Sequence, residues 1–120
     1  MKHSTLIQVL EKVLQKAQQG QPLGSFNNRV LNCTRFTKFN KIMDKFYFKI
    51  NDDMTMYLIK YYEEGALSYY ISFIKDDIEV DYYCLQETDN HFYKVTDIFE
   101  KLQQIKEDQL DKFLAEFLNT

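Results

Sequence analysis

Residues Met43–Gln86 read MDKFYFKINDDMTMYLIKYYEEGALSYYISFIKDDIEVDYYCLQ and determine the architecture expected for this chain. The stretch holds four segments rich in Tyr, Phe, Ile and Val, the residue types that fit a pleated, half-buried surface. Short acidic breaks separate the segments, and breaks of this length join neighbouring strands only as antiparallel hairpins. The expected strands are Lys45–Ile50, Thr55–Tyr62, Leu67–Ile74 and Ile78–Leu85.

A helix is predicted before the sheet. Apolar residues between positions 6 and 17 recur at the three- and four-residue spacing of one helical face, and Thr5 with Gln8 has the spacing of a capping box. Gly20 supplies the C-terminal stop. Residues 21–43 hold scattered apolar side chains without a clear period, which indicates a short extra helix or an irregular strand along the sheet edge.

After the sheet, His91–Val95 fits either a fifth strand or a lead-in to a helix that Thr96 caps. Apolar stripes over residues 98–105 and 110–118 predict one bent helix or two helices. The order is typical of an α+β fold with a four- to five-stranded antiparallel meander sheet and C-terminal helices packed on the sheet. The core of that fold is expected to bury Phe48, Ile71 and Val80 together with Leu10, Phe113 and Phe117.

The period of two along each strand sorts the side chains of the sheet into two faces. Those expected on the core side of the fourth strand are Ile78, Val80, Tyr82 and Cys84. Tyrosines expected on the opposite face, among charged residues, are Tyr47, Tyr70 and Tyr83. Two alternatives stay open for this tyrosine face: it is exposed and offers a protein interface, or it is covered by the C-terminal helices or by residues 21–43.

Length and composition predict a single domain over residues 1–120. A chain of this length hides roughly two-thirds of its unfolded surface, and 45% hydrophobic with 28% charged residues is ordinary for a globular protein. No leader or membrane-spanning segment is recognisable, which predicts a cytoplasmic location. In that compartment Cys33 and Cys84 are expected to be free thiols.

No residue pattern points to catalysis, a cofactor or a metal, so a protein without enzymatic activity is expected. The acidic pairs at 52–53, 63–64 and 76–77 fall in predicted hairpin turns, and meander topology separates the middle pair from the other two. His3, His91 and the two cysteines lack the spacing of a zinc site or of a nucleophile with its base. The three glycines lack the spacing of a phosphate-binding loop.

The net charge of −3 conceals a split between the two halves of the chain. Residues 1–50 hold nine basic and two acidic groups, a net charge of +7, whereas residues 51–120 hold six basic and sixteen acidic groups, a net charge of −10. The acidic half suits a basic protein partner. In the basic half, cations alternate with aromatic side chains, a pattern that single-stranded nucleic acid binders use. This alternative patch consists of Arg35, Phe36, Lys38, Phe39 and Lys41.

A small, acidic, glycine-poor chain with a tyrosine-rich negative half resembles the immunity proteins that bacteria make beside contact-dependent or secreted toxins. The resemblance is one of composition and architecture and involves no motif. It implies a protein-binding inhibitor that neutralises a cognate bacterial toxin, such as a nuclease, by occluding its basic active site. The residues expected to contact the toxin are Tyr47, Tyr70, Asp76, Asp77, Glu79, Asp81 and Tyr83.

Two other classes stay open as alternatives. Secretion chaperones are also small and acidic and combine a helix, a twisted sheet and a closing helix, although their middle strands are normally followed by a helix. A small nucleic-acid-binding module centred on residues 35–41 is the third class. The resemblance to immunity proteins favours a protein partner over a nucleic acid or a membrane, and the sequence is compatible with a monomer or a dimer.

Overall fold

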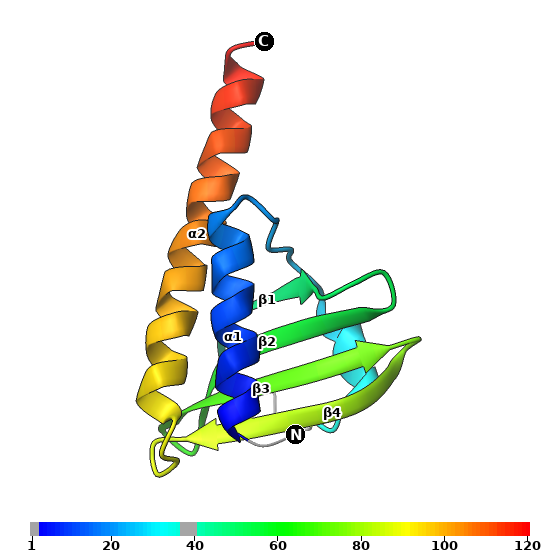
Figure 1. Ribbon diagram of the computed structural model, residues 1–120, viewed down its shortest axis with the longest axis vertical. Helices are drawn as coiled ribbons and strands as arrows, with labels where there is room; N and C mark the ends of the chain where they lie inside the picture. Colours follow the sequence, from blue (N-terminus) through cyan, green and yellow to red (C-terminus); the bar gives the residue numbers. More distant parts are fainter. Residues whose placement is uncertain (1–2, 37–40) are drawn as a thin grey trace. The chain divides into compact units, whose positions relative to one another are not determined.

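The computed structural model describes residues 3–36 and 41–120 (Figure 1). It has an N-terminal helix, four antiparallel strands in one sheet and a C-terminal helix, so the expected α+β class is confirmed. Lys38 and Phe39 of the basic patch lie outside the described residues. The elements are α1 (His3–Gln18), the 3-10 helix η1 (Asn28–Cys33), β1 (Ile42–Lys49), β2 (Met54–Glu63), β3 (Ala66–Lys75), β4 (Ile78–Gln86) and α2 (Phe92–Leu118).

The chain divides into two compact units. One unit combines α1 and the residues that follow it, up to Leu23, with Tyr93–Thr120. The other unit is Gly24–Phe92 and contains the sheet and η1. In the helical unit α1 begins at His3, so Thr5 lies inside its first turn rather than before it.

The sheet has the strand order β1-β2-β3-β4, so strands that are neighbours in space are also consecutive along the chain. Two-residue turns join β2 to β3 at Glu64-Gly65 and β3 to β4 at Asp76-Asp77, and all four turn residues have positive φ. Turns of this kind match the right-handed twist of the paired strands and favour Gly, Asn and Asp. The acidic breaks in the sequence are therefore hairpin turns.

The first face of the sheet is apolar and buried on all four strands. Leu58 of β2 pairs with Phe46 of β1 and with Ile71 of β3, and Ile71 pairs in turn with Tyr83 of β4. Burial of Phe48, Ile71 and, in α1, Leu10 agrees with the core predicted from the sequence. The buried side chains of this face are Phe46, Phe48, Met56, Leu58, Tyr69, Ile71, Phe73, Tyr83 and Leu85.

The face predicted for the side chains of β4 was wrong. A β-bulge shifts the register, since Phe73 pairs with Asp81 whereas the next residue, Ile74, pairs with Glu79. Val80 is the extra residue, and the bulge brings Glu79 to the same face as Tyr82 and Cys84. The four side chains expected in the core are instead exposed, to 67% for Ile78, 57% for Val80 and 36% for Tyr82, with Cys84 exposed as well.

Residues 24–36 cover the second face of the sheet, and η1 lies behind the sheet in Figure 1. Leu31 and Phe36 form a buried cluster with Ile59, Tyr61 and Tyr70. The Phe36 ring meets the rings of Tyr61 and Tyr70 at centroid distances of 4.9 and 5.1 Å. For Tyr70, the alternative in which residues 21–43 cover the tyrosine face is therefore correct.

A single helix, α2, runs without a break from Phe92 to Leu118, so the two apolar stripes belong to one helix rather than two. Of the two alternatives for His91–Val95 the fifth strand is excluded, and the helix start expected at Thr96 was wrong because α2 begins at Phe92. Its first half buries Val95, Ile98, Phe99 and Leu102. Its second half is exposed from Leu110 to the end, and Phe113 and Phe117 are each 74% exposed. The prediction that these two phenylalanines lie in the core was wrong, because helical spacing of apolar residues shows a face suited to burial and not what buries it.

Candidate protein-binding surfaces

Glu79 is held inside a hydrogen-bond network. The Tyr70 hydroxyl and the Ser72 hydroxyl each donate to its Oε2 at 2.6 Å, and the Arg35 amide donates to its Oε1 at 3.1 Å. The Arg35 amide also donates to the Tyr70 hydroxyl at 3.2 Å. Because Tyr70 and Ser72 are buried, Glu79 serves to tie the covering segment 24–36 to the second face of the sheet.

The tyrosines under this segment are kept protonated at neutral pH. Burial raises the pKa of Tyr70, and the hydrogen bond to Glu79 and the negative charge of Glu79 raise it further. Burial likewise raises the pKa of Tyr61 to about 12. A protonated Tyr70 is a donor, which is the form that the Glu79 carboxylate requires.

Three tyrosines predicted to contact a partner offer little free surface. Tyr70 is 1% exposed, and Tyr83 is 8% exposed on the first face, so the assignment of Tyr83 to the outer face was wrong. Tyr47 is half-buried, and its amide and carbonyl pair with Gly24 at 2.8 and 2.9 Å. A methyl group on Gly24 would overlap the Tyr47 ring, so this close approach requires glycine. These tyrosines contribute to packing within the sheet unit.

Four exposed carboxylates gather at one end of the sheet. Met54 pairs with Lys75, which places the turn that holds Asp52 and Asp53 beside the turn that holds Asp76 and Asp77. The two largely exposed apolar side chains of β4 follow directly after the second turn. We call this surface the acidic end, defined by Asp52, Asp53, Asp76, Asp77, Ile78 and Val80.

The exposed edge of β4 is poorly suited to pairing with an added strand. The Tyr82 amide donates to the Asp81 carboxylate at 2.9 Å, and the Gln86 amide donates to the Asp89 carboxylate at 2.7 Å. Asp81 also accepts from the Tyr83 hydroxyl at 3.3 Å. Since side chains of the same chain occupy these backbone donors, the surface favours recognition through side chains.

The basic patch is divided by the fold. Phe36 is 5% exposed inside the cluster on the second face and cannot stack on a base in this conformation. The Arg35 guanidinium lies over the Tyr82 ring at 5.5 Å, and the Lys41 ammonium lies over the Tyr62 ring at 6.0 Å. Their aromatic neighbours are thus already engaged with cations of the same chain.

Neither cysteine belongs to a metal-ligating cluster in the described part of the chain. Cys33 and Cys84 are free thiols. Desolvation raises the pKa of the Cys84 thiol, and the charges of Glu63 and Glu79 raise it further, which disfavours the nucleophilic thiolate. Within residues 3–36 and 41–120, no three His, Cys, Asp or Glu side chains are grouped so as to hold a metal ion.

Sequence reasoning missed an exposed apolar surface on α2. We call it the α2 stripe; its residues and exposed fractions are Leu110 (59%), Phe113 (74%), Leu114 (50%), Phe117 (74%) and Leu118 (79%). The spacing of these residues was visible in the sequence, but it was interpreted as a core contact. An exposed patch of this kind marks an interaction site more often than isolated apolar residues do.

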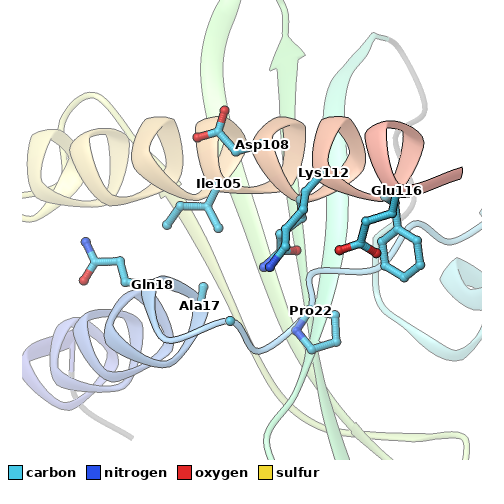
Figure 2. Close-up of a pocket in the computed structure, with 10 residues that line it drawn as sticks. Ala17, Gln18, Pro22, Ile105, Asp108, Lys112 and Glu116 are labelled. Carbon is cyan, nitrogen blue, oxygen red and sulfur yellow. The ribbon is translucent and has the colours of Figure 1, made fainter. Parts of the chain in front are cut away.

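A groove of about 530 Å³ adjoins the α2 stripe within the helical unit. Phe113 belongs to both the stripe and the groove. The side chains that Figure 2 labels around the groove are Ala17 and Gln18 of α1, Pro22 of the following loop, and Ile105, Asp108, Lys112 and Glu116 of α2.

Comparison with known proteins adds no relative. No protein-family model, no curated protein and no solved structure matches this chain. Among the described helices, none is both long and apolar enough to span a membrane.

Proposed function

We propose that this protein is a stoichiometric inhibitor that binds a basic protein partner in the cytoplasm. Immunity proteins, which neutralise a cognate bacterial toxin, are the class that this proposal favours, with the basic cleft of a nuclease as the candidate target. The inhibitor acts by occlusion, so it needs surface complementarity and no catalytic group.

The acidic end carries this proposal. Asp76 and Asp77 are exposed next to Ile78 and Val80, which combines electrostatic attraction with apolar contact area at one site. Lys49 and Lys75 lie near the same end and reduce, without cancelling, the charge of its four carboxylates. Glu79 and Asp81 support this surface from β4 through their hydrogen bonds.

The set of residues proposed to contact the partner therefore differs from the set expected from the sequence. Asp76 and Asp77 stay as direct contacts, and Ile78 and Val80 join them. Tyr47, Tyr70 and Tyr83 act by holding the sheet in shape. The nucleic-acid alternative loses support because Phe36 is buried, and a secretion chaperone remains an alternative in which the same surface would bind an effector segment.

A capture experiment tests the proposal. The tagged protein is incubated with extract of its source cell, with and without nuclease treatment, next to the Asp76→Asn/Asp77→Asn variant. Asparagine, like aspartate, is favoured at positive φ among residues with a side chain, so the variant removes two charges and leaves the turn intact.

We expect a basic protein to be recovered in stoichiometric amount by the parent, to survive nuclease treatment, and to be recovered less by the variant at low salt. Glu100→Gln is the matched control, because it removes an exposed carboxylate from α2, far from the acidic end in sequence. Recovery of nucleic acid alone, or of a protein that nuclease releases, would contradict the inhibitor function.

A further inference from the structure

We propose that the α2 stripe is a docking surface for an amphipathic helix with basic flanks, presented by a protein partner. The inference rests on the proposed function in so far as that function supplies a basic partner. It adds a second site, in the other compact unit of the chain, whose chemistry can be tested separately.

The stripe begins directly after Gln109, the last residue of α2 that is part-buried. The Gln109 side-chain amide donates to the Gln21 carbonyl at 3.0 Å, and its Oε1 accepts from the Leu23 amide at 3.0 Å. These two bonds fix the loop after α1 to α2 at this position. From Leu110 onward every residue of α2 is exposed, and in Figure 1 the helix continues past the end of α1.

The size of the stripe suits a helix. Residues 110 to 118 span about 12 Å of helix axis, or more than two turns. Five large side chains, each at least half exposed, present on the order of 500 Å² of apolar surface, within the range of patches that are often functional. Spacing of i, i+3, i+4, i+7 and i+8 is the pattern by which two helices interlock.

The charges around the stripe select the partner. At about 100° per residue, Glu107 and Asp111 follow one border of the stripe, and Glu116 lies beyond the other border; all three are exposed. Residues 106–118 contain four carboxylates and two lysines, a net charge of −2. A helix with lysine or arginine on its flanks complements this charge pattern.

The same charges argue against two other occupants. A second copy of this chain would bring another segment of net charge −2 against the first, so self-pairing opposes like charges. An anionic membrane surface attracts amphipathic helices with basic polar faces, which is the opposite of this segment. An amphipathic helix with basic flanks can pack its apolar side chains on the stripe and pair its cations with the carboxylates beside the stripe.

The groove lies beside the stripe, along residues 105–116 of α2. Ile105 and Phe113 supply apolar wall, and Lys112 and Glu116 line the same groove, whereas the Asp108 carboxylate lies on the side of α2 turned away from α1 (Figure 2). A bulky side chain of the docked helix can enter this groove, and the Glu116 carboxylate can receive a flanking cation.

A designed peptide tests the proposal without the natural partner. The probe is a fluorescein-labelled 18-residue helical peptide with leucines at i, i+3, i+4 and i+7 spacing and lysines on both borders; a second peptide carries glutamates in place of the lysines. Anisotropy titrations against the full chain are expected to show saturable 1:1 binding of the lysine peptide and at least about tenfold weaker binding of the glutamate peptide at low salt.

Matched variants locate the site. Phe113→Gln/Phe117→Gln changes two exposed side chains to good helix formers and is expected to weaken lysine-peptide binding at least about tenfold with unchanged circular dichroism. Tyr93→Gln, at a 66% exposed aromatic of the same helix, is expected to leave binding unchanged. Equal binding by the double variant and the parent, or equal binding of both peptides, would overturn the proposal.

Sedimentation velocity on the parent and the double variant tests whether a second copy of the chain occupies the stripe. A parent monomer supports the proposal, whereas a dimer that the double variant dissolves would show that a second copy occupies the stripe and would overturn it. Failure of the proposed function is distinguished by the Asp76→Asn/Asp77→Asn variant, which acts on capture of the natural partner and is expected to bind the lysine peptide as the parent does.

Discussion

Replacement of Glu79 by alanine is expected to destabilise the protein by about 3 kcal/mol. The change leaves the Tyr70 and Ser72 hydroxyls, which are 1% and 0% exposed, without the carboxylate oxygen that both contact at 2.6 Å. Each buried donor left unsatisfied costs about 1–3 kcal/mol. The Arg35 amide keeps a contact with the Tyr70 hydroxyl, and relief of the desolvation of Glu79 offsets part of the loss, so the expected value lies in the lower half of the summed range of about 2–6 kcal/mol.

Urea unfolding followed by circular dichroism measures this free energy. Glu79→Gln retains an acceptor oxygen and is expected to cost about 1 kcal/mol, the difference between a charged and a neutral hydrogen-bond partner. Glu100→Ala, at an exposed helix position, is expected to stay within about 0.5 kcal/mol of the parent. A Glu79→Ala protein as stable as the parent would refute the network that joins residues 24–36 to the sheet.

Three further expectations follow from burial and close contact. Gly24→Ala is expected to cost about 1–3 kcal/mol in urea unfolding, and Tyr47→Ala is expected to suppress that cost in the double variant, because the added methyl overlaps the Tyr47 ring; additive costs would contradict this. The folded-state pKa values of Tyr61 (about 12) and Tyr70 lie above the ordinary value of 10, so the unfolded chain releases these protons at lower pH than the folded protein does. The contribution of both tyrosines to the unfolding free energy is therefore complete below pH 10 and falls from pH 10 towards 12. An unfolding free energy that stays constant over this range would contradict burial of both hydroxyls. Phe113→Ala is expected to change the unfolding free energy by less than about 1 kcal/mol because the side chain is 74% exposed, and a loss of about 3–5 kcal/mol would instead show a docked core residue.

Strand positions and hairpin order could be predicted from the sequence because they depend on local signals. Strands are specified by alternating segments of Tyr, Phe, Ile and Val, and turns by the short breaks at Glu64-Gly65 and Asp76-Asp77. Each of these signals involves only residues that are close together in the sequence. The acidic end was predictable for the same reason, since meander topology alone brings the first and third turns together. Asp76 and Asp77 lie where that reasoning expected them.

The faces of β4 and the role of α2 could not be predicted, because both depend on contacts distant in sequence. The bulge at Val80 depends on the pairing of β3 with β4, and β4 carries apolar residues at odd and even positions, so alternation alone did not assign its faces. Leu110, Phe113 and Phe117 have the spacing of a core helix, and that spacing is the same whether the face is buried within the chain or binds a partner. Coverage of the tyrosine face by residues 21–43 stayed one of two alternatives, because the backbone of residues 24–36 is mostly irregular and has no period that would assign its buried side.

The most direct test of the central claim is the salt dependence of association with the captured partner. The association rate constant of the parent is measured by stopped flow or surface plasmon resonance between 0.01 and 0.15 M salt, where the Debye length falls from about 30 Å to about 8 Å. Binding of a basic partner by the acidic end predicts a steep fall for the parent and a slower, flatter rate for Asp76→Asn/Asp77→Asn, with the two converging at high salt. Identical rate constants for the parent and the variant at every salt concentration would contradict the claim.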